Sequence, residues 1–118
     1  MARESGEENM FYVRKVLEVS ASHRVRLASN GACEDLHGHN WTITVHCRSE
    51  NLGENGMVVD FDDIERIVRM GLDHRDLNES LGFNPTAENI ARWVVERVPH
   101  CYRATVQETR DNEASYEL

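Results

Sequence analysis

The sequence of 118 residues has few cysteines, few basic side chains and no long apolar run. Three cysteines without a Cys-x-x-Cys pair argue against a disulfide framework. Thirteen Lys and Arg against 21 Asp and Glu give a formal net charge of −8, which disfavours nucleic acid and anionic membranes as partners. No stretch approaches the roughly 20 apolar residues of a membrane-spanning helix, and residues 1–9 lack the apolar segment of a secretion signal. We therefore expect a cytoplasmic protein with one domain, residues 1–118, and a flexible lead-in over residues 1–10.

Two segments alternate apolar and polar residues with the period of a β-strand. Residues 11–22 place apolar side chains on one face, with Lys15 as the exception, and His23 continues that face. Residues 39–47 alternate Trp, Ile, Val and Cys with Thr, Thr and His. Residues 24–36 have no periodicity and contain Ser-Asn-Gly, which is typical of a loop. The pattern predicts two strands joined by this loop.

A turn and two helices are predicted next. Residues 50–56 end in the turn dipeptide Asn-Gly, so residues 57–60 are predicted as the returning strand of a hairpin. Residues 62–70 have apolar side chains at helical spacing and begin with two aspartates. A second helix is expected to begin after Thr86, a good N-cap residue, and to end at Pro99.

The C-terminal part completes a sheet. Residues 102–108 alternate as a strand, and residues 111–118 are expected to add a short edge strand. The resulting order predicts an α+β fold, with a four-stranded antiparallel sheet covered by two helices on one face. Such a sheet leaves one face and two edges exposed, so we expect a homo-oligomer.

Three of the six histidines, His23, His37 and His39, fall within 17 residues. His37 and His39 flank Gly38 and project from the same side of an extended chain, and His23 ends the strand expected to pair nearby. Three imidazoles from two strand ends suit Zn²⁺ with one position open for water or substrate, whereas structural sites usually have four protein ligands. We therefore predict a catalytic zinc site, although a His-x-His pair alone is more often incidental.

Cys33 lies four residues before His37, at the mouth of the predicted site. It can act as a fourth zinc ligand, which would close the site, or as a free thiolate activated by the metal and the imidazoles. Cys47 and Cys101 are better explained as small buried residues, because one continues an apolar strand face and the other follows a helix end.

Three other segments carry acids or an imidazole. Asp73 is adjacent to His74, and an acid in that position can orient an imidazole and fix its tautomer; a solvated loop pair is the alternative. Thr86 and Glu88 are explained by a helix start. Glu108, at a strand end, either binds a guanidine-like ligand edge or is a simple exposed charge.

Six segments in order resemble the 6-pyruvoyltetrahydropterin synthase / 6-carboxytetrahydropterin synthase family. They are Ala21-Ser-His23-Arg24, Cys33-Glu-Asp-Leu-His37-Gly-His39-Asn40, Gly56-Met-Val-Val-Asp60-Phe61, Leu72-Asp73-His74 with Leu77-Asn78, Asn84-Pro-Thr86-Ala-Glu88-Asn89 and Gln107-Glu108-Thr109. The resemblance implies the tunnelling fold, in which trimers close their sheets into a barrel and two trimers stack, with sites at subunit interfaces.

The resemblance also implies roles for individual residues. The zinc ligands are expected to be His23, His37 and His39. The catalytic cysteine is expected to be Cys33, which shares proton transfer with Asp73 and His74. Glu108 corresponds to the acid that anchors the 2-amino and N3–H edge of the pterin. Thr86 and Glu88 correspond to the segment that closes over the pterin from a neighbouring subunit.

The short chain resembles the queuosine-pathway type of this family. This implies conversion of 7,8-dihydroneopterin triphosphate to 6-carboxy-5,6,7,8-tetrahydropterin, with release of acetaldehyde and triphosphate. A 6-pyruvoyl product is one alternative, and a structural protein with a closed zinc site is the non-enzymatic one. Glu34 directly follows Cys33, and this arrangement resembles that of a subgroup that also forms 6-hydroxymethyl-7,8-dihydropterin for folate. In that case Glu34 is a second base; the alternative is a solvated loop residue. Ala87 stands where the animal enzymes have a hydroxyl residue, which leaves one pterin contact in doubt.

Overall fold

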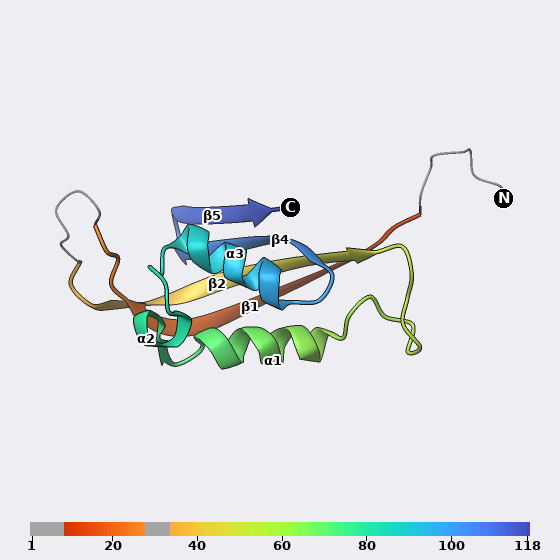
Figure 1. Ribbon diagram of the computed structural model, residues 1–118, viewed down its shortest axis with the longest axis horizontal. Coiled ribbons are helices and arrows are strands. Elements are labelled where there is room, and N and C mark those ends of the chain that lie inside the picture. The colour runs from red at the N-terminus through yellow and green to blue at the C-terminus, as the bar shows by residue number, and fades with distance from the viewer. Residues whose placement is uncertain (1–8, 28–33) are drawn as a thin grey trace.

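The computed structural model describes residues 9–27 and 34–118. Its dominant feature is a long antiparallel pair of strands, β1 (Phe11–His23) and β2 (His37–Ser49), which align from Phe11 opposite Ser49 to His23 opposite His37 (Figure 1). Both predicted strands are confirmed. β2 extends two residues beyond the predicted range at each end, because β1 pairs with it there. The predicted flexible lead-in lies almost wholly outside the described residues.

The sheet has five strands in the order β3-β1-β2-β4-β5. β4 (Cys101–Thr109) and β5 (Asn112–Glu117) are antiparallel, and β5 is the predicted edge strand. β3 (Arg75–Asp76), at the other edge, pairs in parallel with β1. The prediction of four antiparallel strands is therefore wrong: the sheet is mixed and has a fifth strand. A strand of two residues leaves no period in the sequence, and only its pairing with β1 defines it.

The turn after β2 has the predicted geometry. Gly56 has a φ of +76°, as its place in the Asn-Gly dipeptide requires. The backbone N–H of Gly53 donates to the carbonyl oxygen of Met57 at 2.9 Å, which closes the turn.

The predicted strand over residues 57–60 is wrong, because this stretch leads into a helix. Val58 is buried against the core, and Asp60 is the N-cap of α1 (Phe61–Leu72). A carboxylate oxygen of Asp60 accepts the backbone N–H of Asp62 at 2.8 Å. An N-cap residue has extended backbone angles, so a stretch that ends in one resembles a strand while its hydrogen bonds belong to the helix.

Two further helices follow. α2 (Leu77–Leu81) was not predicted, and it is a single short turn capped by Asp76. α3 (Ala87–Arg97) begins after Thr86, as predicted, and its C-cap residue Val98 directly precedes Pro99.

The core lies between one face of the sheet and helices α1 and α3, as predicted. α3 lies along β4 and α1 runs beside β1 (Figure 1). The largest fully buried side chains include Trp41 and Ile43 of β2, Ile64 of α1 and Ile90 of α3. The ring of Trp93 on α3 reaches across to α1: a Cβ atom on Gly71 would lie 2.3 Å from Cη2 of Trp93, so a larger residue there would force a shift.

None of the helices in the described part of the chain covers the other face of the sheet. Alternate strand residues on this face, among them Ser20, Ser22 and Asn40, are partly or fully exposed. Within the described ranges, no helix is long and apolar enough to cross a membrane.

Candidate metal centre and active site

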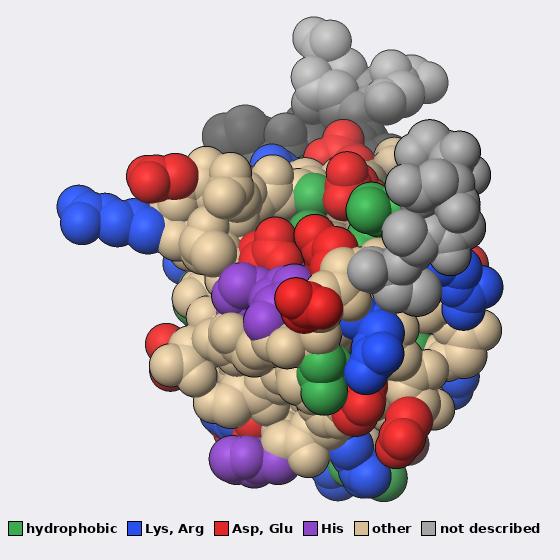
Figure 2. All heavy atoms as spheres, turned by 90° about the vertical axis from the view of Figure 1, so that its left-hand side faces the viewer, with side chains coloured by type: hydrophobic (Ala, Val, Ile, Leu, Met, Phe, Trp, Pro, Cys, Tyr) green, Lys and Arg blue, Asp and Glu red, His purple; other side chains and the backbone are tan. Residues whose placement is uncertain are grey.

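Three strand ends meet at one end of the core. The register places His23 opposite His37, and His39 opposite Ala21, so the three imidazoles share the core-facing side of β1 and β2. Glu108 joins them from the end of β4, and the four ligand atoms all lie within 4.8 Å of one another. Figure 2 shows histidine and acidic side chains together at this end of the molecule. The predicted histidine cluster is therefore present, with a carboxylate added.

Backbone carbonyl groups fix the orientation of two of the imidazoles. His23 is buried, and its Nδ1 lies 2.7 Å from the carbonyl oxygen of Pro85. Nδ1 of His37 lies 2.8 Å from the carbonyl oxygen of Asp35. A carbonyl oxygen can only accept, so each Nδ1 carries the hydrogen and each Nε2 keeps a lone pair for a ligand. Such contacts commonly orient histidines that bind metals.

Two of the cluster's ring nitrogens are buried without a well-directed hydrogen bond. Nε2 of His23 lies 2.9 Å from Oε1 of Glu108, and Nε2 of His39 lies 3.1 Å from the same oxygen. Neither contact has hydrogen-bond geometry, so both nitrogens are unsatisfied within the described part of the chain. Burial lowers the pKa of His39, which favours the neutral imidazole that a metal requires. Unsatisfied buried nitrogens beside a carboxylate fit a divalent cation such as zinc.

Glu108 was predicted from the resemblance as a pterin anchor, and its place among the histidines was missed. The signal was present in the alternation of β4. Ala104 and Val106 are buried in the core, and Glu108 is the next residue on the same face. Only the three-dimensional sheet order places that strand end beside β2.

Asp73 and His74 lie at a different corner, where α1 ends. Oδ1 of Asp73 accepts the backbone N–H of Ser20 at 3.0 Å, and the N–H of His74 donates to the carbonyl oxygen of Ser20 at 2.6 Å. His74 has a positive φ of 55°, which turns the chain into β3. Its Nε2 lies 3.8 Å from Oδ1 of Asp73, and its side chain is 83% exposed. Asp73 and the backbone of His74 are therefore held against β1, while the His74 ring is exposed and beyond hydrogen-bond distance of Asp73.

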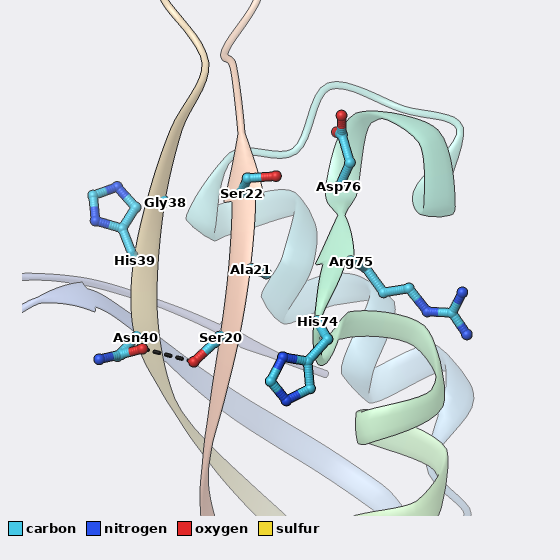
Figure 3. A pocket seen from close by; sticks show the side chains of 9 residues that line it. All are labelled: Ser20, Ala21, Ser22, Gly38, His39, Asn40, His74, Arg75 and Asp76. Atoms are coloured by element: carbon cyan, nitrogen blue, oxygen red, sulfur yellow. Dashed lines mark hydrogen bonds between the residues drawn. The ribbon is translucent and has the colours of Figure 1, made fainter.

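The corner opens on a pocket of about 550 Å³ over the uncovered face of the sheet. Ser20 and Asn40 line it and share a hydrogen bond of 2.7 Å, and the ring of His74 points toward them (Figure 3). In the same view β1 and β2 lie between the ring of His74 and that of His39. His39 also lines this pocket together with His74. Among the described residues, the group of ligand atoms within 4.8 Å of one another nevertheless includes neither Asp73 nor His74.

The start of α3 borders the histidine cluster. Oγ1 of Thr86 accepts the backbone N–H of Asn89 at 3.1 Å, which is the helix-capping contact. Glu88 and Glu108 line one polar pocket of about 370 Å³ with residues 111–114 of the β4–β5 turn and β5. The two predicted binding acids thus share a pocket within a single chain.

The family model of 6-pyruvoyl tetrahydropterin synthase matches residues 12–118. The chain belongs to this family. Among pterin synthase relatives, a Synechocystis protein described as 6-carboxy-5,6,7,8-tetrahydropterin synthase is 34% identical over 121 aligned positions, covering 91% of this chain and 93% of the relative. A Pyrococcus furiosus protein described as dihydroneopterin monophosphate aldolase is 38% identical over 81 positions, covering 66% of each chain.

A solved member of the pterin synthase family has the same fold. The structure of 6-pyruvoyl tetrahydropterin synthase from Caenorhabditis elegans superposes with a TM-score of 0.71 and 25% identity, covering 94% of this chain and 97% of that one. The tunnelling fold implied by the sequence resemblance is confirmed for the single chain.

Two residues predicted from the pterin synthase resemblance, Cys33 and Glu34, come between β1 and β2 in the sequence. Cys33 is outside the described residues. Glu34 is exposed, and its Oε1 accepts the backbone N–H of Val25 at 3.2 Å, while its own N–H donates to the carbonyl oxygen of Val25 at 3.0 Å. The Glu34 side chain thus has a local structural contact at the base of the loop.

Proposed function

We propose that this chain is a zinc-dependent lyase that converts 7,8-dihydroneopterin triphosphate to 6-carboxy-5,6,7,8-tetrahydropterin, with release of acetaldehyde and triphosphate. The reaction belongs to the route to queuosine. The observation that carries the proposal is the cluster of His23, His37 and His39, with two buried Nε2 atoms that lack a hydrogen bond among the described residues. Family membership and the name of the Synechocystis relative support the choice of substrate and product.

The cluster is the proposed zinc site. Zinc bound there supplies a Lewis acid that polarises the side-chain oxygens of the substrate and acidifies neighbouring O–H and C–H groups. The protein contributes the fixed rings of His23 and His37, oriented by the carbonyl groups of Pro85 and Asp35. His39 contributes a ring kept neutral by its burial.

Proton transfer is assigned to Asp73, His74 and Cys33. His74 opens on the pocket, where its imidazole can exchange protons with a substrate. Asp73 is held as a carboxylate by the amide of Ser20 and by the guanidinium of Arg69, and it can stabilise a protonated His74. Cys33 is proposed as a base, because three imidazoles already satisfy a catalytic zinc and a thiolate ligand would occupy the substrate's position.

Glu108 is the proposed pterin anchor. Its carboxylate lines the polar pocket beside α3, where the 2-amino and N3–H groups of a pterin can donate two hydrogen bonds to it. Glu88 lines the same pocket, and Thr86 holds the start of α3 next to it. One oxygen of Glu108 also contacts His23 and His39, so substrate binding and the metal centre share this residue.

The active protein is proposed to be a homo-oligomer, a trimer or a hexamer. β5 and the two-residue β3 are the edges of the sheet, and the strand pairing of a single chain leaves them open. The ligand group among the described residues includes neither Asp73 nor His74, so the Asp73–His74 pair of a neighbouring copy is proposed to complete each site. Light scattering at micromolar concentration tests this assembly, and an active monomer would rule it out.

Two other pterin products remain as alternatives within the family. A 6-pyruvoyl product would keep all the carbons of the substrate. The Pyrococcus relative, described as an aldolase, favours an additional 6-hydroxymethyl product, in which Glu34 would act as a second base. The hydrogen bond from Val25 to Glu34 restrains that carboxylate at the base of the loop, which argues for the structural role of Glu34.

Incubation with 7,8-dihydroneopterin triphosphate and mass analysis of the products test the proposal directly. We expect release of acetaldehyde together with the carboxylated pterin. If a pyruvoyl or hydroxymethyl pterin is the main product, the corresponding alternative function replaces the proposed one.

The role of Cys33 is tested by substitution. Cys33→Ala is expected to keep zinc and lose most turnover, with Cys47→Ala as the matched control. If Cys33→Ala loses zinc while Cys47→Ala keeps it, Cys33 is a fourth zinc ligand and the site is the closed structural one.

A further inference from the structure

Asp73 is held through both of its carboxylate oxygens. Oδ1 accepts the backbone N–H of Ser20 on β1 at 3.0 Å, and Oδ2 accepts Nη1 of Arg69 on α1 at 3.0 Å. The side chain of Asp73 is 17% exposed, so these contacts are partly shielded from water. Arg69 lies outside all the segments that carry the family resemblance, and its contact with Asp73 is a feature of this chain's own structure.

The guanidinium of Arg69 is itself immobilised. Nη1 also donates to the carbonyl oxygen of Glu18 at 3.0 Å, and Nε and Nη2 donate to Oε1 of Glu65 at 3.2 and 3.1 Å. Glu65 in turn lies 4.0 Å from Nζ of Lys15 on β1. All three nitrogens of the fork are engaged, and a planar fork held in this way fixes its partner's position more tightly than a lysine would.

We propose that Arg69 is a positioning residue that holds the Asp73 carboxylate in place for proton transfer by His74. This inference rests on the proposed function. With Oδ2 fixed by Arg69, Oδ1 is directed toward the amide of Ser20 and the ring of His74, whose Nε2 is 3.8 Å away. Arg69 does not line the pocket on which His74 opens, so it acts through Asp73 and not on the substrate.

The same contacts keep Asp73 ionised. The amide of Ser20 is the largest cause of the lowered pKa of Asp73, and Arg69 and His74 lower that pKa further, against the opposing effect of burial. The charged groups around the carboxylate are Arg69 and Glu65 on α1, Lys15 beside Glu65, and His74. Removal of the Arg69 charge therefore raises the pKa of Asp73 and protonates it at a higher pH.

The test compares Arg69→Gln and Arg69→Lys with Arg66→Gln in the full-length enzyme. Arg66 is the matched control, because it is an exposed arginine on the same helix that pairs with Asp63. Arg69→Gln should lower kcat by about tenfold with KM unchanged, because the substrate still binds while the Asp73 carboxylate is no longer held. Arg69→Lys keeps the charge and loses the fork, so its kcat should fall to an intermediate value. Arg66→Gln should match the wild type.

A second readout does not depend on turnover. Carbon-13 NMR of the Asp73 carboxyl group in the folded, substrate-free protein should show a higher pKa in Arg69→Gln than in the wild type or in Arg66→Gln. Failure of the wild type to turn over the pterin would refute the proposed function, whereas this titration still decides whether Arg69 controls Asp73. Unchanged kcat and unchanged titration in folded Arg69→Gln would overturn the inference. If Arg69→Gln does not fold, wild-type kcat in Arg69→Lys would overturn it.

Discussion

The histidine cluster and the Asp73–His74 corner are built in different ways. Regular strand register assembles the cluster: residues two apart on β1, β2 and β4 reach the same face, and the strand ends bring His23, His37, His39 and Glu108 within 4.8 Å. The corner has no such repeat. It depends on a helix end, a residue at positive φ, and single hydrogen bonds to Ser20 and Arg69. A regular element tolerates small sequence changes around its site, whereas a corner held by individual contacts is sensitive to each of them.

The largest effect is expected for the cluster. His37→Ala removes one of three imidazoles that converge on the proposed metal, so metal affinity should fall by at least about a hundredfold, because even the loss of an outer partner costs 10- to 100-fold. Metal analysis after dialysis measures this, with His46→Ala on the same strand as the control. Unchanged metal content in His37→Ala would show that the register does not build a metal site.

Glu108→Ala tests the residue shared by the cluster and the pterin pocket. Loss of a charged acceptor for two pterin donors should cost about 1.5–3 kcal/mol of binding, which is a rise in KM of about 10- to 150-fold. Steady-state kinetics on the folded variant measure this. If Glu108→Ala loses metal but its metal-loaded fraction keeps the KM of the wild type, Glu108 binds the metal and not the pterin.

Gly71→Ala tests the packing beneath the corner. The added Cβ would lie 2.3 and 2.5 Å from ring atoms of Trp93, so the Trp93 ring or the helix backbone must shift. We expect a loss of about 1–3 kcal/mol of unfolding free energy, measured by urea denaturation. Metal binding by the cluster should be unchanged; a parallel loss of metal affinity would show that the two regions are coupled.

The smallest effect is expected for the pH dependence of stability in Asp73→Asn. The pKa of Asp73 is lowered from its ordinary value of 3.8, so ionised Asp73 stabilises the folded state above that pH, and this stabilisation disappears as the pH falls through the folded-state pKa. Asp73→Asn should therefore be less stable than the wild type at pH 7, and the difference should shrink below about pH 4. Urea denaturation at several pH values measures it, with Glu96→Gln on the exposed side of α3 as the control. A difference that does not vary with pH would contradict the assignment.

Much of the fold was predictable because local patterns carry it. The alternation of β1, β2 and β4, the Thr86 cap and the Asn-Gly turn each follow from residues close together in sequence. The strand predicted over residues 57–60 failed because an N-cap has extended angles. The two residues of β3 and the short helix α2 were missed because neither is long enough to show a period.

The sequence by itself determined the family, the main strands and helices, and the three histidines, because spacing of two in a strand is a local property. Only the tertiary structure decided that Glu108 joins them, since that requires β4 to lie beside β2. It also decided that the ligand group among the described residues includes neither Asp73 nor His74, and that Arg69 holds Asp73. These facts depend on contacts between distant segments, and no local pattern of residues encodes which distant groups will meet.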